Sequence, residues 1–355
     1  MEPQHTSNDA APQPVVPRKV AVGVFAHNEE ANIASAIGQL AAIDFTGYDA
    51  TIFVLANGCT DRTVPMAKAL IDALDTPANV AFRIVDLAVG DKSSTWDVYV
   101  DDALALGAEL LVFCDCDIEF GSDRTVRDLI ELLDRTPQAH AASSIPIKQL
   151  GPGATRFARL AAGGPATYDS KTAIAGHLYA LRGSFAARFR LPAGMPCEDG
   201  FVRALVVTDL FTRQDDVTRI AADDAISHRF EPVRTIREWH RHERRIIVGT
   251  TINYFLFQIL WARVGKDPAD ADAGAVLRSL GSGSTTWLRD LVGEHARKRY
   301  WIVPKEYGLR RFKNPDGSRV SLSSLPKRIP MTVLDWAAAI GANRILRSGR
   351  AVGHW

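Results

Sequence analysis

Apolar and polar positions alternate in a regular order over the first third of the chain. Short apolar runs rich in β-branched residues predict strands over 19–28, 51–58, 80–87 and 109–115. Stretches with apolar residues at helical spacing follow the first three runs and predict helices over 29–43, 60–74 and 93–107. Strands that alternate with helices of this length are typical of an α/β protein, with a mostly parallel central sheet flanked by helices.

The first predicted helix carries its own start signals. Asn28 is a suitable N-cap residue, and the two glutamates that follow it suit the positive end of the helix dipole. In parallel sheets, ligands bind at the carboxyl ends of the strands, where His27, Asn57 and Asp115 lie. We therefore expect these three side chains to share one edge of the sheet.

The alternation weakens after about residue 150. The pattern predicts a mobile loop over 160–170, a strand over 171–183, a helix over 198–211, and a largely helical remainder from Thr235 that is interrupted at 281–284. We expect three parts: a disordered leader over 1–17, an α/β domain over 18–230 and a mainly helical C-terminal region over 231–355.

Composition narrows the class of protein. The 355 residues carry a formal net charge of +1, so charge alone gives no general attraction to nucleic acid or membrane. The four cysteines are too few for a secreted disulfide scaffold, and the N-terminus lacks the apolar core of a secretory signal. The apolar stretch 246–262 is short for a membrane span and contains four polar residues, which favours a buried or interfacial helix. We therefore expect a cytoplasmic protein.

The sequence lacks a glycine-rich phosphate cradle. No GxGxxG follows the first predicted strand, and no GxxxxGK[ST] occurs. Asp115 and Asp117 are the substitute, because two carboxylates can hold Mg²⁺ or Mn²⁺ and such an ion neutralises a diphosphate. Taken alone, the pair also fits a turn or a helix cap. Cys114 and Cys116 are poor ligands for a hard cation, so we expect them to be small buried hydrophobic residues.

Other short motifs accompany this pair in a definite order. In chain order they are FAHNEE (25–30), ANGCTDRT (56–63), VGDKSSTWD (89–97), DCD (115–117), IAGHLYALRGS (174–184), CEDGFV (197–202) and RHERRIIVG (241–249). Their order and spacing resemble glycosyltransferase family 2, whose members have the GT-A fold and transfer sugars from nucleotide-diphosphate donors. The resemblance runs from about residue 20 to 249. It implies a nucleotide-binding half of the α/β domain up to about residue 120 and an acceptor half after it.

The resemblance also implies roles for individual residues. Asp199 would be the catalytic base; Glu198 and Asp199 also fit an N-terminal helix cap, and both roles can hold at once because a helix start fixes a carboxylate in place. The expected contacts to the nucleotide sugar are Phe25, His27, Glu29, Asn57, Lys92, Asp115 and Arg245. Glu198 and His177 are expected to face the acceptor, and the expected metal ligands are Asp115, Asp117 and His228. A lone histidine such as His228 is also common as a packed side chain.

The last motif departs from the family pattern Q-R-x-R-W. Arg245 keeps the second arginine, whereas His242, Glu243 and Ile246 replace the glutamine, the first arginine and the tryptophan. That motif is prominent in processive polysaccharide synthases. Its erosion, together with the missing transmembrane bundle, predicts a soluble enzyme that adds a single sugar.

The C-terminal region is locally basic. Residues 297–328 hold ten Lys and Arg against two acidic residues, with the aromatic residues Trp301, Tyr307 and Phe312 among them. This pattern fits a solvated face, and it also fits an anionic acceptor or a membrane surface that carries a lipid acceptor. The amphipathic stretch 331–350 fits a helix that lies on that surface or caps the catalytic domain. No reader motif for nucleic acid accompanies these charges, so we expect no nucleic-acid partner.

The leading interpretation is an inverting, metal-dependent glycosyltransferase that moves a sugar from a UDP- or GDP-linked donor to an acceptor hydroxyl. A retaining transferase of the same fold, or a nucleotidyltransferase that uses the aspartate pair, remains an alternative. A non-catalytic protein that binds a nucleotide sugar or a membrane surface is a third option. The expected location is the cytoplasm, with peripheral contact at the inner face of the membrane if the basic region binds lipid.

Overall fold

The structure, a computed structural model, describes residues 17–151, 153–162, 171–312, 320–321 and 325–353. The predicted leader, apart from its last residue, and most of the predicted loop over 160–170 lie outside the described residues.

A single mixed sheet organises the described residues. Its order is β3-β2-β1-β4-β7-β6-β8-β5. The strands are β1 Arg18–Ala26, β2 Tyr48–Asn57, β3 Val80–Leu87, β4 Leu110–Asp115, β5 Ile118–Phe120, β6 Ala141–Lys148, β7 Leu178–Arg182 and β8 Ile220–Phe230. Strands β3, β2, β1 and β4 pair in parallel, whereas β7 runs antiparallel to both β4 and β6. The expected α/β class with a mostly parallel sheet is confirmed.

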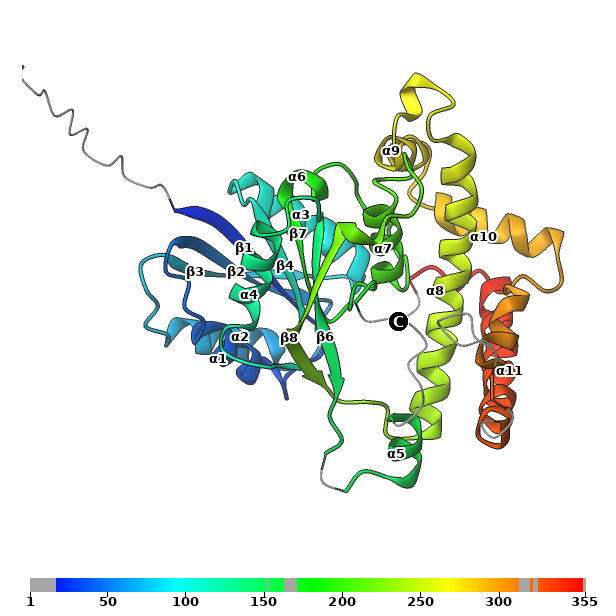
Figure 1. The fold of residues 1–355 in the computed structure, drawn as a ribbon, viewed down its shortest axis with the longest axis horizontal. Helices are drawn as coiled ribbons and strands as arrows, with labels where there is room; N and C mark the ends of the chain where they lie inside the picture. The colour runs from blue at the N-terminus through cyan, green and yellow to red at the C-terminus, as the bar shows by residue number, and fades with distance from the viewer. Residues whose placement is uncertain (1–16, 152, 163–170, 313–319, 322–324, 354–355) are drawn as a thin grey trace, which may run out of the picture.

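Helices cover both faces of this sheet (Figure 1). The α-helices are α1 Ile33–Ala41, α2 Thr63–Asp72, α3 Lys92–Ala105, α4 Thr125–Asp134, α5 Arg156–Ala162, α6 Gly183–Ala186, α7 Glu198–Val207, α8 Ile236–Arg263, α9 Ala273–Gly283, α10 Trp287–Lys298 and α11 Leu325–Arg347. Short 3₁₀ helices are η1 Val217–Arg219, η2 Pro268–Asp270 and η3 Lys305–Phe312. One apolar core joins α1, α2 and α4 to the sheet, and a second joins α3, α6 and α7 to the other face and extends to α8 and the C-terminal helices.

Stacked aromatic rings hold α3 against the sheet. Trp96 of α3 stacks on Phe113 of β4 with ring centroids 5.2 Å apart, and Phe113 stacks on Tyr179 of β7 at 4.6 Å. The Trp96 indole N–H donates a hydrogen bond to the Tyr179 hydroxyl at 2.9 Å, which satisfies both buried polar groups. This packing fixes the N-terminal end of α3 beside the carboxyl ends of the strands.

Several predicted element ends were wrong. The first helix begins at Ile33 with Asn32 at its N-cap position, and not at Asn28. Asn28 takes a left-handed backbone conformation with φ of 57°, and its side-chain oxygen accepts a hydrogen bond from the Thr60 N–H at 2.8 Å. The Asn28 side chain therefore stabilises the loop after β2 and does not cap a helix.

Three other predicted boundaries also differ from the structure. The strand predicted over 171–183 is confined to β7, and the helix predicted over 198–211 ends at Val207. The predicted break at 281–284 begins only at its last residue, because α9 continues to Gly283.

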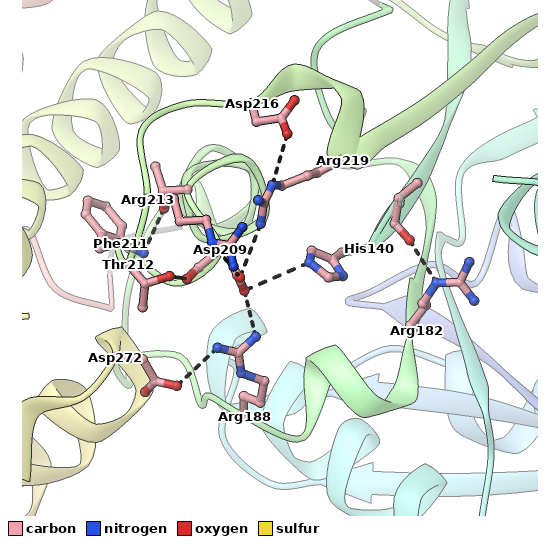
Figure 2. Close-up of polar contacts among 12 residues, drawn as sticks. His140, Arg182, Arg188, Asp209, Phe211, Thr212, Arg213, Asp216, Arg219 and Asp272 are labelled. Carbon is pink, nitrogen blue, oxygen red and sulfur yellow. Dashed lines mark hydrogen bonds and ion pairs between the residues drawn. The ribbon is translucent and has the colours of Figure 1, made fainter. Parts of the chain in front are cut away.

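A cluster of arginines around one carboxylate secures the end of α7 (Figure 2). Asp209, Leu210 and Phe211 follow this helix with φ of 46°, 58° and 64°, which is costly for residues with side chains. The Asp209 carboxylate accepts a hydrogen bond from Arg188 at 2.7 Å and forms an ion pair with Arg219 at 3.3 Å. These contacts tie the strained turn to the segments after α6 and before β8.

The long helix α8 stands between the sheet and α11 (Figure 1). Among the described residues, α8 is the one helix that is long and apolar enough to cross a membrane, judged by length and composition alone. Half of its most apolar 18-residue stretch is buried inside the protein. Its buried side chains, such as Ile247, Ile252 and Leu256, belong to the core shared with α7. The predicted buried or interfacial helix over 246–262 is therefore part of a longer helix that packs on α7.

Candidate active site

The carboxyl ends of the parallel strands form the expected shared edge. Asp115 ends β4 and stands opposite Phe25 in the register between β4 and β1, and its backbone N–H donates to the His177 carbonyl at 2.8 Å. Asp117 follows in the turn to β5 and is exposed. Cys114 and Cys116 are 3% and 2% exposed, and burial raises the pKa of both thiols. The prediction that these cysteines are packing residues is confirmed.

Lys92 joins the aspartate pair to the acidic pair at the start of α7. It is the first residue of α3, and its Nζ lies 2.8 Å from Asp115 Oδ1 and 3.0 Å from Glu198 Oε1. Burial alone would lower the pKa of Lys92, but the two carboxylates outweigh it and hold this pKa well above its usual value. Burial would likewise raise the pKa of Asp115, and Lys92 reverses this, so the net shift is downward. The attraction between Lys92 and Asp115 therefore favours the charged form of each of these two groups.

The N-terminal end of α3 also holds the segment that leads into α7. The Asp91 carboxylate, which caps α3, accepts a hydrogen bond from the Gly194 N–H at 2.8 Å, and Asp97 accepts one from the Leu191 N–H at 2.9 Å. Burial raises the pKa of Asp97 to about 7, in part offset by the hydrogen bond from Leu191. These contacts explain how Lys92 and Glu198, far apart in the chain, meet at one point.

Asp199 lies in the first turn of α7, packed closely against the backbone of Gly176. A Cβ added at Gly176 would stand 2.8 Å from Asp199 Oδ2, so only glycine leaves room for this carboxylate. Burial raises the pKa of Asp199, and the neighbouring charge of Glu198 raises it further. A carboxylate whose proton affinity is raised in this way is a better proton acceptor than an ordinary aspartate.

Helix α8 fixes the position of the α7 start. Cys197, just before α7, has a left-handed backbone with φ of 57°, and its side chain fits only because residue 249 of α8 is a glycine. The Asn253 side chain on α8 donates a hydrogen bond to the Cys197 carbonyl at 3.2 Å. The strained residue before Glu198 is thus held by the long helix, which makes α8 a supporting element of the site.

His228 of β8 presents an unused imidazole nitrogen near the aspartates. The Ser144 hydroxyl donates to the Leu178 carbonyl at 2.9 Å, and its oxygen lies 2.6 Å from His228 Nδ1. Since that hydroxyl proton is already used, Nδ1 carries the ring proton and Nε2 carries the lone pair. Nε2 is buried and has no hydrogen-bond partner in the structure. Burial lowers the pKa of His228 to about 3, so the ring is neutral at physiological pH.

These groups fit a hard divalent cation. Carboxylate oxygens and a neutral imidazole, oriented by a hydrogen bond on its other nitrogen, match what Mn²⁺ or Mg²⁺ accepts from a protein. The orphaned Nε2 of His228 is the observation that favours such a ligand. In the described part of the chain, however, no three His, Cys, Asp or Glu side chains are already grouped as a metal site. One oxygen of Asp115 is held by Lys92, so the donor set is present but not preassembled.

Two of the residues expected to contact the nucleotide sugar, Phe25 and Asn57, are buried and contact other side chains and backbone groups of the protein. Phe25 is only 8% exposed, and its ring packs on Tyr99 and Phe113. Asn57 is 3% exposed, and its side-chain oxygen accepts hydrogen bonds from the Asp91 N–H at 2.6 Å and the Thr95 hydroxyl at 2.9 Å. Asn57 therefore positions the start of α3, a role that the sequence did not predict.

The other expected residues lie around the aspartates. His27 is exposed, and its Nδ1 donates to the Asn57 carbonyl at 2.6 Å. Burial raises the pKa of Glu29, with smaller contributions from Asp117 and Asp115, which places this glutamate in their field. The His177 ring stacks on Phe230 at 4.7 Å, and its centroid lies 5.5 Å from that of His228.

The remaining expected contact, Arg245 on α8, lowers the pKa of Asp115 by its charge. It forms no ion pair with any side chain that the structure describes. Arg245 is thus close enough to Asp115 to influence its charge, and it has no ion-pair partner among the described side chains.

Three residues that hold the site residues in place were not predicted from the sequence. Ser144 orients His228, Gly176 makes room for Asp199, and Asp91 anchors the segment before α7. Gly176 and Asp91 stand inside the motifs at 174–184 and 89–97, beside residues that were singled out. Ser144 stands in no motif, and its contact depends on the pairing of β6 with β8.

Comparison with solved structures finds matches among glycosyltransferases. The mannosyltransferase PcManGT from Pyrobaculum calidifontis, in complex with GDP-Man and Mn²⁺, matches with a TM-score of 0.54 and 16% identity over 96% of this chain and 90% of that chain. TarS 1-349 of S. aureus, in complex with UDP-GlcNAc, matches with a TM-score of 0.44 and 14% identity over 93% and 90% of the two chains. Glucosyl-3-phosphoglycerate synthase from Mycobacterium tuberculosis matches with a TM-score of 0.45 and 19% identity over 66% and 79%. At these identities the likeness to the mannosyltransferase shows the fold alone, and that fold is GT-A.

The fold and the matched family define the class of protein, a glycosyltransferase of the GT-A type. The family model described as glycosyl transferase family 2 matches residues 21–204, which is more than half of the chain. The chain therefore belongs to glycosyl transferase family 2. A comparison with curated protein sequences found no match.

Proposed function

We propose that the enzyme transfers one sugar from a nucleotide-diphosphate donor to an acceptor hydroxyl, with inversion at the anomeric carbon and with Asp199 as the base. The observation that carries this proposal is the Asp199 carboxylate, which packs on Gly176 with a raised pKa beside the Lys92–Glu198 pair. Asp199 accepts the proton of the acceptor hydroxyl as its oxygen attacks the anomeric carbon. The bond from that carbon to the diphosphate oxygen breaks, and the nucleoside diphosphate leaves with the electron pair.

Neighbouring charges orient the reacting groups. Lys92 holds Glu198 and Asp115 in place, so the acceptor and donor sides of the site share one cation. Arg245, which has no ion-pair partner among the described side chains, is available to bind the diphosphate through its forked N–H groups. His27 and Glu29 border the nucleoside position, and His177 borders the acceptor.

Asp115, Asp117 and His228 would hold a Mg²⁺ or Mn²⁺ ion. When bound, such an ion supplies neutralisation of the charge that develops on the leaving diphosphate. Ser144 keeps the proton of His228 on Nδ1, which leaves Nε2 as a ligand. The mannosyltransferase of similar fold was solved with GDP-Man and Mn²⁺, which is a reason to test GDP-linked donors beside UDP-linked ones.

The contacts of Glu243 with η3 support the proposal that the enzyme adds a single sugar and is not processive. This residue stands where processive relatives have an arginine, and it is 9% exposed. Its carboxylate accepts a hydrogen bond from the Tyr307 hydroxyl at 2.6 Å and one from Arg310. Glu243 therefore holds η3 in place, and Arg245 is the residue of this motif that supplies positive charge to the site.

The cysteines support a proposal for the cellular location. All four are free, and Cys114 and Cys116 are buried, which is typical of a reducing compartment, so we propose the cytoplasm.

Thermal unfolding with a panel of UDP- and GDP-linked sugars, with and without Mn²⁺, tests this function. A ligand that binds only the native state at 100 times its Kd stabilises it by about 2.7 kcal/mol. We expect at least one nucleotide sugar to raise the unfolding temperature, and we expect Asp117→Asn to remove the part of the rise that depends on Mn²⁺. The exposed Asp123→Asn is the matched control and should behave as the wild type. No rise with any donor in the presence of Mn²⁺ would contradict the proposal.

The product decides between the transferase mechanisms. NMR of the product formed from an α-linked donor should show a β linkage. An α linkage would mean a retaining enzyme, and release of pyrophosphate would mean a nucleotidyltransferase. Donor binding without any product in the presence of all acceptor classes would favour a non-catalytic binding protein.

A further inference from the structure

Helix α11 is apolar on two opposite faces, and only one of them is covered. Its buried face packs on α8 and α10 through Ala338, Ala339, Ala342 and Leu346, each fully buried. Four large apolar side chains on the opposite face stay exposed: Ile329 (52%), Val333 (64%), Trp336 (41%) and Ile340 (45%). Their spacing of three and four residues places them in one line along the helix. We call these four residues the α11 stripe.

The α11 stripe lies at the edge of the molecule. In Figure 1, α11 is on the far side of α8 from the sheet, so α8 stands between α11 and the strand ends that carry the site. Trp336 is held in place although it is exposed, because its ring lies directly over Gly308 and its centroid is 5.8 Å from that of Trp301. A fixed aromatic ring in such a line loses little entropy when it binds a surface.

Positive charge gathers at the C-terminal end of the stripe. Arg344 and Arg347 are exposed and continue the same helix face, one and two turns beyond Ile340. A hollow of about 300 Å³ opens beside them, lined by Tyr300, Asn343, Arg344, Arg347 and Ser348. Arg297 and Arg299 at the end of α10 are also exposed, and neither they nor Arg344 form an ion pair with a described side chain.

Among the described residues of α11, no carboxylate is exposed on this face. Asp335 is the one acidic residue of α11, and it is 1% exposed and paired with Arg310 and Arg311 on the opposite side of the helix. The exposed face therefore offers apolar and cationic groups with no carboxylate of α11 among them. That combination is complementary to an anionic surface with an apolar interior.

We propose that the α11 stripe binds the surface of a lipid bilayer that carries anionic headgroups. The stripe enters the boundary between headgroups and acyl chains, where Trp336 and Tyr300 have both an apolar and a polar environment. Arg344 binds a lipid phosphate at the hollow, and Arg297 and Arg299 add positive charge at the nearby end of α10. This surface does not depend on the proposed sugar transfer, and it would bring the enzyme to acceptors held in the membrane.

A second copy of the chain fits the stripe less well. Stable protein interfaces use roughly 20–30 residues on each side, whereas the stripe offers four side chains. Pairing two stripes in parallel would also place the arginine clusters beside each other, and like charges without partners oppose association.

Flotation of the full-length protein with vesicles tests the proposal. One set of vesicles contains phosphatidylcholine alone, and the other contains phosphatidylcholine with phosphatidylglycerol. We expect binding to the anionic vesicles that weakens as salt is raised. The double variant Val333→Ser, Ile340→Ser should weaken binding at least tenfold, and Arg344→Gln about fivefold, as expected for one surface arginine. Val217→Ser, which removes an exposed apolar side chain in η1, is the matched control and should bind as the wild type.

Several results would overturn the proposal. One is wild-type protein that stays unbound to the anionic vesicles at low salt. Another is undiminished binding of the double variant, which would mean attraction by charge alone. A dimer of the wild type that the double variant abolishes would assign the stripe to a second copy. Circular dichroism and unfolding of the variants establish that they are folded, and the assay needs no sugar donor, so its failure leaves the proposed transfer untouched.

Discussion

Substitution of Asp97 gives a quantitative test of how the segment before α7 is held. Asp97 accepts a hydrogen bond from the Leu191 N–H at 2.9 Å, and burial raises its pKa from 3.8 to about 7. Asp97→Asn keeps an acceptor oxygen for this hydrogen bond and removes the charge. We therefore expect the variant to differ from the wild type chiefly in how its stability depends on pH.

The size of the effect follows from the pKa values in the two states. Between pH 4 and pH 7 the native protein keeps a proton on Asp97 that the unfolded chain has lost. Stability from this group is therefore present at low pH and is lost as pH rises through about 7. With about 1.4 kcal/mol for each pKa unit, the loss between pH 5 and pH 8 is about 2 to 3 kcal/mol. The asparagine variant should escape that loss.

Urea unfolding at pH 5 and pH 8, followed by tryptophan fluorescence, measures this difference. The free energy of unfolding of Asp97→Asn relative to the wild type should rise by about 2 to 3 kcal/mol between the two pH values. Asp72→Asn, at an exposed position at the end of α2, is the control and should show no such rise. An equal difference at both pH values would mean that Asp97 ionises as in the unfolded chain, and the reasoning would fail.

Three further predictions concern the site. Lys92→Met should lower the free energy of unfolding by about 3 kcal/mol, measured by urea unfolding, because it leaves Asp115 and Glu198 beside each other without their cation. Gly176→Ala should lower kcat about 100-fold, because its Cβ would force Asp199 Oδ2 to retreat from 2.8 Å to an ordinary contact distance. Burial and Glu198 raise the pKa of Asp199, so kcat/KM should fall as pH drops through a midpoint above 3.8.

Each of these predictions has a result that contradicts it. Wild-type stability of Lys92→Met would mean that the two carboxylates do not need this lysine. Gly38→Ala, where an added Cβ meets nothing within 4 Å, is the control for Gly176→Ala, and equal kcat values for the two variants would refute the steric argument. A midpoint at or below 3.8 in the pH profile would mean that Asp199 is not the group whose protonation stops the reaction.

The sheet and its chemistry could be predicted because they depend on local patterns. Apolar runs mark strands, and polar residues directly after them fall at one edge of a parallel sheet, as Asp115 does. The burial of Cys116 followed from the poor match between a thiol and a hard cation. The start of the first helix could not be predicted in this way. Asn28 has the chemistry of a cap, but a contact with Thr60 uses its side chain, and that contact exists only after β2 has paired with β1.

The supporting contacts of the site arise from tertiary structure. Lys92 was expected near the nucleotide, but its position between Asp115 and Glu198 depends on the loop that α3 holds. The free lone pair of His228 depends on a hydrogen bond to Ser144 across two strands. Neither follows from spacing in the sequence, because each joins segments that the fold brings together from distant parts of the chain.

Donor binding and sugar transfer by Asp199→Asn test the central claim most directly. The asparagine has the shape of the aspartate and cannot accept the proton, and a general base contributes roughly 10²- to 10⁴-fold to such a rate. We predict that the variant binds the nucleotide sugar and Mn²⁺ as tightly as the wild type in titration calorimetry, while its transfer rate falls at least 100-fold. A variant that transfers sugar at the wild-type rate would show that Asp199 is not the base and would contradict the account.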